Sequence, residues 1–175
     1  MTRILRSFLA AAVLTGAWVD AAHADIRAFS SKVLPNRAGQ VVAGFPASGV
    51  DWAIRSGRVG LFALGGDRFL LTLRVRGLII PVMEGPVCTP FGTETCFGFN
   101  PSPDLLARVV CHDESGEPFV ADTTRATTNF TPEGDGLLFD RVEIPEICFA
   151  PIVLIGGSMG PPPTFEPNWF AISGF

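Results

Sequence analysis

The stretch FLLTLRVR, residues 69–76, decides the fold class of this chain. Successive side chains of a β-strand point to opposite faces of a sheet, so an alternating pattern predicts one buried and one solvated face. The buried face would present Phe69, Leu71, Leu73 and Val75. The solvated face would present Leu70, Thr72, Arg74 and Arg76. We therefore predict a strand of an antiparallel sheet here.

Similar segments bounded by turn residues occur on both sides of this strand. Residues 58–64 precede it, and Gly65-Gly66-Asp67 between them is typical of a hairpin turn. Further strands are predicted over 78–82, 105–111, 119–123, 137–144, 148–155 and 169–173, with weaker ones near Val33 and Val41. Pro151 lacks an N–H group, which places its strand at an edge or at a bulge. Residues 102–107 can alternatively begin as a helical turn, because Ser-Pro-Asp suits a helix start.

The pattern as a whole predicts an all-β chain. About seven to nine short strands with regular turns, and no long helical period, favour a single antiparallel β-sandwich. We expect a signal peptide over residues 1–24 and a weakly structured N-terminal segment, or edge strands, over 25–48. The β-sandwich domain would then occupy 49–175.

The N-terminus has the parts of a secretory signal peptide. Arg3 and Arg6 supply positive charge, residues 7–19 are apolar, and Ala22-His23-Ala24 matches a cleavage site before Asp25. The apolar run is shorter than the roughly 20 residues of a membrane helix, so an uncleaved anchor is the weaker alternative. We expect a secreted or periplasmic protein with no membrane span after cleavage.

The charge balance bears on the partners. The chain has 13 basic and 17 acidic residues, a net charge of −4. This balance argues against nucleic acid and against anionic membrane surfaces, because both bind basic patches. Lys32 is the only lysine, and this preference for arginine indicates a bacterial source.

The four cysteines are expected to form disulfides in an exported chain. Four cysteines allow three pairings. We favour Cys88–Cys96, which closes a loop rich in turn residues, and Cys111–Cys148, which joins two distant strands. A zinc site or a redox pair in CTPFGTETC is weaker, because zinc prefers closer cysteines and His112 is the only histidine after the signal peptide. No metal and no cofactor are expected.

The motif GGSMG, residues 156–160, matches the G-x-S-x-G of a nucleophile elbow. An elbow needs a helix directly after the serine, but the prolines at 161–163 prevent one. His112 also precedes Ser158, whereas this hydrolase order places histidine after the serine. We interpret the motif as a Gly-rich loop that leaves a buried strand, and we expect His112 to be exposed.

Acidic residues flank two predicted turns. One group is Asp113, Glu114, Glu117 and Asp122, and the other is Glu133, Asp135 and Asp140. Neither group has the spacing of an EF-hand, and the spacing does not indicate a glycosidase pair. We interpret both as solvated turns, with a surface calcium site or a carboxylate pair as the alternatives.

Aromatic residues gather in and beside the predicted Cys88–Cys96 loop: Phe91, Phe97 and Phe99. Rings held on a rigid loop can anchor a partner, and a disulfide would reduce the entropy lost on binding. The same rings can instead fold back and cap the open end of the sandwich. Both interpretations stay open.

Four segments together carry a resemblance: VRGLIIP at 75–81, VVC at 109–111, EIPEICFAPIVLI at 143–155 and WFAISG at 169–174. The combination resembles a group of uncharacterised secreted bacterial β-sandwich proteins with a strand cysteine pair and a C-terminal WFAxxG strand. The resemblance covers most of the chain from Trp52 onward. It implies a fold and no activity, so no functional residue follows from it.

These observations predict a non-enzymatic exported protein that binds a partner or surface through its loops. The partner would be a protein or a carbohydrate of the cell envelope. The alternative is a small extracytoplasmic hydrolase or sugar-active enzyme. No spacing of candidate catalytic residues in the sequence supports it.

Overall fold

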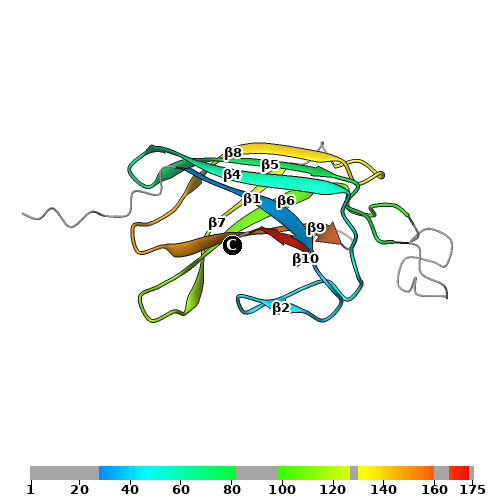
Figure 1. Cartoon of the computed structure of the whole chain (residues 1–175), viewed down its shortest axis with the longest axis horizontal. Helices are drawn as coiled ribbons and strands as arrows, with labels where there is room; N and C mark the ends of the chain where they lie inside the picture. Colours follow the sequence, from blue (N-terminus) through cyan, green and yellow to red (C-terminus); the bar gives the residue numbers. More distant parts are fainter. Residues whose placement is uncertain (1–27, 82–97, 127–129, 160–165, 174–175) are drawn as a thin grey trace, which may run out of the picture.

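A computed structural model describes residues 28–81, 98–126, 130–159 and 166–173 (Figure 1). These residues form an all-β fold, as predicted. The strands are β1 (Ala28–Pro35), β2 (Val41–Val42), β3 (Phe45–Pro46), β4 (Ser56–Gly65), β5 (Arg68–Arg76), β6 (Leu105–His112), β7 (Pro118–Ala126), β8 (Gly136–Glu143), β9 (Phe149–Met159) and β10 (Glu166–Ser173). Within the described ranges there is no helix that is long and apolar enough to cross a membrane.

The main strands form one eight-stranded antiparallel sheet, which we call the ladder, in the order β7-β6-β9-β10-β1-β4-β5-β8. The ladder folds into two layers, β4-β5-β8 and β7-β6-β9-β10, which we call sheet A and sheet B (Figure 1). Strand β1 belongs to both, because residues 28–32 pair with β4 and residues 33–35 pair with β10. The fold is therefore a β-sandwich whose two sheets share a strand.

The two outer strands of the ladder, β7 and β8, are linked by side chains. The hydroxyl of Thr124 donates to the carboxylate of Asp140, and the backbone N–H of Glu143 donates to Asp122 at 2.8 Å. These bonds bring the free edges together, so the sandwich is nearly closed like a barrel. They also engage two carboxylates that the sequence placed in solvated turns.

The core lies between the sheets and confirms the predicted orientation of β5. Its buried side chains from β5 are Phe69, Leu71, Leu73 and Val75. Sheet B opposes them with Leu105, Ala107, Val109, Val153 and Ile155. Trp52 stacks on Phe170 with ring centroids 3.8 Å apart, which adds an aromatic contact to this core.

A second, smaller core covers the outer face of sheet B. Its buried members are Leu106, Val110, Ile152, Leu154, Trp169 and Ile172. The β2–β3 hairpin packs on them through Val42 and Phe45. The guanidinium of Arg108 lies 5.3 Å from the ring centroid of Phe45 and 4.7 Å from that of Trp169. The hairpin therefore covers a face of β6 that alternation alone makes solvated.

Strand β1 differs from the weak or edge strand expected in 25–48. It lies in the middle of the ladder, between β10 and β4. Its outward residues Ser30 and Lys32 are polar, so its local composition resembles that of an exposed segment. Its internal position follows from pairing with strands distant in sequence.

Strand β9 is internal in the ladder, and the bulge expected at Pro151 is confirmed. Among the described residues its pairs with β10 begin at Val153, so the edge alternative for Pro151 stays a prediction. The register between β6 and β9 shifts between Val110 and His112, and Ala150 has a φ of 45°. Pro151 has no N–H to donate, and it lies at this register shift, where no residue of β6 is paired with it. The helical turn considered for 102–107 is wrong, because β6 begins at Leu105.

Cys111 and Cys148 form the disulfide that the sequence favoured, with Cα atoms 5.0 Å apart. Both residues are buried in the main core. The bond ties the end of β6 to the start of β9. Cys88, Cys96, Phe91 and Phe97 lie outside the described residues.

Candidate functional site

Residues 156–159 of the Gly-Ser motif lie inside β9, whereas the sequence suggested a loop; Gly160 lies outside the described residues. Residues Gly156 and Gly157 pair with β10 in the ladder, and Ser158 is buried. Each glycine permits a close approach: a Cβ on Gly156 would lie 2.0 Å from the backbone oxygen of Asn168. A Cβ on Gly157 would lie 1.9 Å from the hydroxyl of Ser102. The glycines therefore serve packing.

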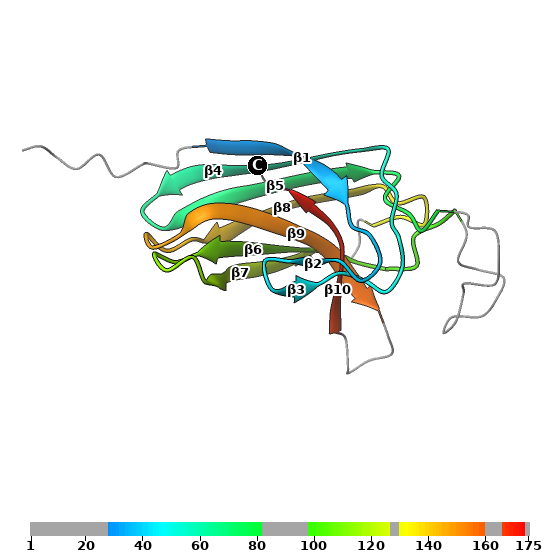
Figure 2. The same cartoon turned by 60° about the horizontal axis from the view of Figure 1, so that its bottom comes forward.

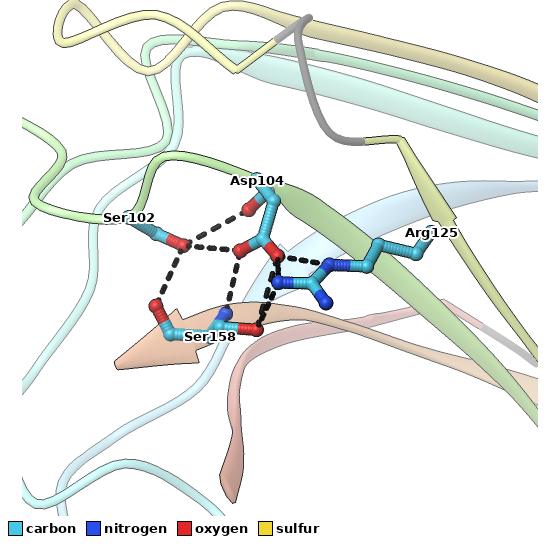
Figure 3. A network of polar contacts seen from close by, with 4 residues as sticks. All are labelled: Ser102, Asp104, Arg125 and Ser158. Carbon is cyan, nitrogen blue, oxygen red and sulfur yellow. Dashed lines mark hydrogen bonds and ion pairs between the residues drawn. The ribbon is translucent and has the colours of Figure 1, made fainter. Parts of the chain in front are cut away.

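Ser158 belongs to a polar cluster with Ser102, Asp104 and Arg125 (Figure 3). The Asp104 carboxylate accepts hydrogen bonds from the Ser158 backbone N–H at 2.7 Å and the Ser158 hydroxyl at 3.0 Å. It also accepts from the guanidinium of Arg125, with which it forms an ion pair. The cluster joins β7, the start of β6 and the end of β9.

The electrostatics of the cluster keep Asp104 ionised. Its side chain is 2% exposed, and this burial by itself raises the pKa. Hydrogen bonds from Ser158, together with the hydrogen bond and positive charge of Arg125, lower the pKa more, so that it lies below the ordinary carboxyl value. Asp104 therefore acts as a hydrogen-bond acceptor at neutral pH.

This arrangement does not activate Ser158. A nucleophilic hydroxyl needs a neighbouring base that takes its proton. The neighbours here are a carboxylate of lowered pKa and the guanidinium of Arg125, whose Nη2 donates to the Ser158 hydroxyl at 3.0 Å. His112 ends β6, whereas Asp104 precedes it, which separates them by roughly 25 Å of strand. The cluster therefore has a structural role, which is to connect β7, the start of β6 and the end of β9.

We expect Asp104→Asn to lower the free energy of unfolding by about 2 kcal/mol at neutral pH, because charged hydrogen bonds are lost in a buried site. The folded-state pKa of Asp104 is depressed, so its stabilisation is present above the unfolded carboxyl value of about 3.9. That stabilisation disappears as the pH falls through the lower folded value. Denaturant titrations at several pH values should show the gap between variant and wild type closing below about pH 4. Glu114→Gln, at an exposed position, is the control, and a gap that stays constant with pH would contradict this role.

A second feature is the outer face of sheet A, which has a row of three cations. Lys32 on β1 pairs directly with Arg58 on β4, and Arg58 pairs directly with Arg74 on β5. All three side chains are exposed, and none forms an ion pair with another described residue. Adjacent strands are about 4.8 Å apart, and like charges directly opposite destabilise a sheet. We call these residues the cation row.

The same face has more basic residues and very little opposing charge. Arg68 and Arg76 on β5 and Arg141 on β8 occupy outward positions and are exposed. Glu143 is the only acidic residue at the outward positions of β4, β5, β8 and residues 28–32 of β1, all of which the structure describes. The fold thus concentrates positive charge on one face of a chain whose net charge is −4.

Exposed apolar side chains cross this face diagonally. Phe62 and Leu64 on β4 are 41% and 48% exposed, and Leu137 and Phe139 on β8 are 40% and 62% exposed. Half-buried Leu70, which pairs with Phe62, connects the two ends across β5. We call Phe62, Leu64, Leu137 and Phe139 the apolar stripe, and the whole outer surface of sheet A the basic–apolar face. No described element covers it (Figure 1).

The other residues considered from the sequence are placed apart from this face. Asp113 Oδ1 accepts from the backbone N–H groups of Ser115 and Glu117 at 2.8 and 3.0 Å, which closes the turn. His112 is half-buried rather than exposed. Phe99 is half-buried and bridges Ile80. Among the described residues no group of histidine, cysteine and acidic side chains could hold a metal ion.

Comparisons of the chain with protein-family models, curated proteins and solved structures give no match. The resemblance noted from the sequence therefore stays a prediction. The function has to be inferred from the geometry of the basic–apolar face and the polar cluster.

Proposed function

We propose that the protein is an exported, non-enzymatic binding protein that holds an anionic partner on the basic–apolar face. The observation that carries this proposal is the cation row. Its three like charges repel one another in the free protein, and an anionic partner would relieve that repulsion. Structures that keep such a local cost commonly do so at functional sites.

Two observations support export. The Cys111–Cys148 disulfide fits an oxidising compartment. Residues 1–24 have the composition of a bacterial signal peptide. A secreted or periplasmic location in a bacterium accounts for both.

The polar cluster supports binding over the hydrolase alternative. The Ser158 hydroxyl is buried and donates to Asp104, so the G-x-S-x-G motif is used for structure. The exposed side chains on the basic–apolar face are arginines, one lysine, phenylalanines and leucines, which supply contact and charge.

A cation-exchange resin tests the proposal directly. With a sequence pI of about 5.1, the protein would pass unretained at pH 7 if its charge were evenly spread. We expect wild type to be retained at low salt through the basic–apolar face, and Arg58→Gln/Arg74→Gln to pass through. Arg37→Gln and Arg55→Gln are the controls, because both arginines are exposed and lie outside the strands of this face. Unretained wild type, or equal loss in every variant, would contradict the proposal.

A further inference from the structure

We infer that the partner of the basic–apolar face is the surface of an anionic lipid bilayer. This inference rests on the proposed function and names its partner. It departs from the expectation drawn from net charge, because the fold separates the basic residues from most of the acidic ones.

The order of side chains across the face matches the layers of such a membrane. The cation row lies on one side of the apolar stripe, and Arg68 and Arg141 lie on the other. A lipid surface presents phosphates above hydrocarbon, so exposed Phe and Leu side chains can enter while arginines at the rim bind phosphates. A stripe with cations on both sides can insert its apolar side chains and bind phosphates at the same time.

The composition of the stripe favours lipid over the other anionic partners. An acidic polysaccharide would stack its rings on aromatic side chains, but Leu64 and Leu137 have no ring and form half of the stripe. Apart from the cations, the outward hydroxyls beside the stripe are those of Ser30 and Thr72, which gives a sugar few neutral hydrogen-bonding groups. Exposed apolar patches with polar rims are typical of membrane contact sites and of protein interfaces. Cations lie on both sides of this stripe, and among them only Arg68 is directly opposite an acidic residue, Glu143, which favours the membrane.

The fold sets the orientation that such binding would produce. Sheet A would lie flat on the bilayer, with β4, β5 and β8 running parallel to its surface. The β2–β3 hairpin packs on the opposite face of the sandwich and would point away from the membrane (Figure 2). The β2–β3 hairpin, which packs on the outer face of sheet B, would face the solvent.

Vesicle sedimentation tests the inference. We expect the exported protein to sediment with vesicles of phosphatidylglycerol and phosphatidylcholine, and at least about tenfold less with phosphatidylcholine alone. Phe62→Ser/Phe139→Ser should bind vesicles about tenfold more weakly while keeping wild-type retention on the cation exchanger. Phe149→Ser is the matched control, because Phe149 is 51% exposed on β9, outside the face. Arg58→Gln/Arg74→Gln should lose both activities.

The outcomes separate this inference from the proposed function. Retention on the exchanger without vesicle binding would overturn the lipid surface and leave an anionic polysaccharide or protein as the partner. Absence of both would overturn the proposed function too. Vesicle binding that Phe62→Ser/Phe139→Ser leaves unchanged would also overturn the inference. Circular dichroism melts of each variant show whether a loss of binding comes from unfolding, and single Phe139→Ser replaces any double variant that does not fold.

Discussion

Replacing both Cys111 and Cys148 with alanine is expected to lower the free energy of unfolding by about 4 kcal/mol. The bond closes a sequence separation of 37 residues, and loop closure restricts the unfolded chain more as the loop lengthens. That loop contains β7 and β8, which belong to different sheets. The bond joins the neighbouring strands β6 and β9 of sheet B, so it holds the two ends of this segment together.

The measurement is equilibrium unfolding in urea, with melting followed in parallel. A loss of this size corresponds to a fall in Tm of roughly 10 °C for a domain of this length. Wild type kept in reductant should approach the stability of the double variant. Equal stability of variant and wild type under oxidising conditions would show that the bond adds nothing to the packing around it.

Gly157→Ala is expected to be nearly as damaging, at about 3 kcal/mol. The new methyl carbon would lie 1.9 Å from the Ser102 hydroxyl and 2.6 Å from the backbone oxygen of Asp104. Ser102 can turn its side chain, but Asp104 directly precedes β6 and its carboxylate is held by the polar cluster, so its backbone cannot easily move. The strand would have to move away from Ser158, which also breaks the bonds to Asp104.

Gly49→Ala is the matched control for this substitution. A Cβ there meets no atom within 4 Å, and the residue does not need a positive φ. The same change should be neutral, or stabilise by about 0.5 kcal/mol through the unfolded state. If both variants melt like wild type, the close packing of β9 against the segment before β6 is wrong.

Local pattern predicted much of the fold. Alternation placed β5 and its buried face correctly, and the turn residues between β4 and β5 marked the hairpin. The disulfide followed from placing Cys111 on the core face of its strand. These features depend on neighbours in sequence, where side-chain periodicity and turn chemistry act.

The features that alternation missed depend on contacts between distant segments. Arg108 occupies a position that alternation makes solvated, yet the rings of Phe45 and Trp169 flank it. Nothing near Arg108 in the sequence indicates that a distant hairpin will cover it. The internal position of β1 was missed for the same reason.

The candidate binding face required the register of four strands. The arginines at 58 and 74 look like ordinary solvated positions on separate strands, and Lys32 lies in a segment expected to be weakly structured. Only pairing places them in one row. The net charge pointed away from an anionic partner, because a sum over the chain carries no information about where the charges lie.

The strand shared by the two sheets has a consequence for the order of folding. Val33 pairs with Ser173, so the first and last strands in the sequence meet in the middle of the ladder and join its two halves. Contacts between segments so distant in sequence form slowly, because the chain must lose the entropy of a long loop first. Sheet A contains no residue of β10 and can assemble while β10 is still free, but β1 stays half unpaired until β10 arrives. A chain crossing a membrane from its N-terminus would therefore remain incompletely folded through most of its passage. Folding would finish only when β10 pairs with β1.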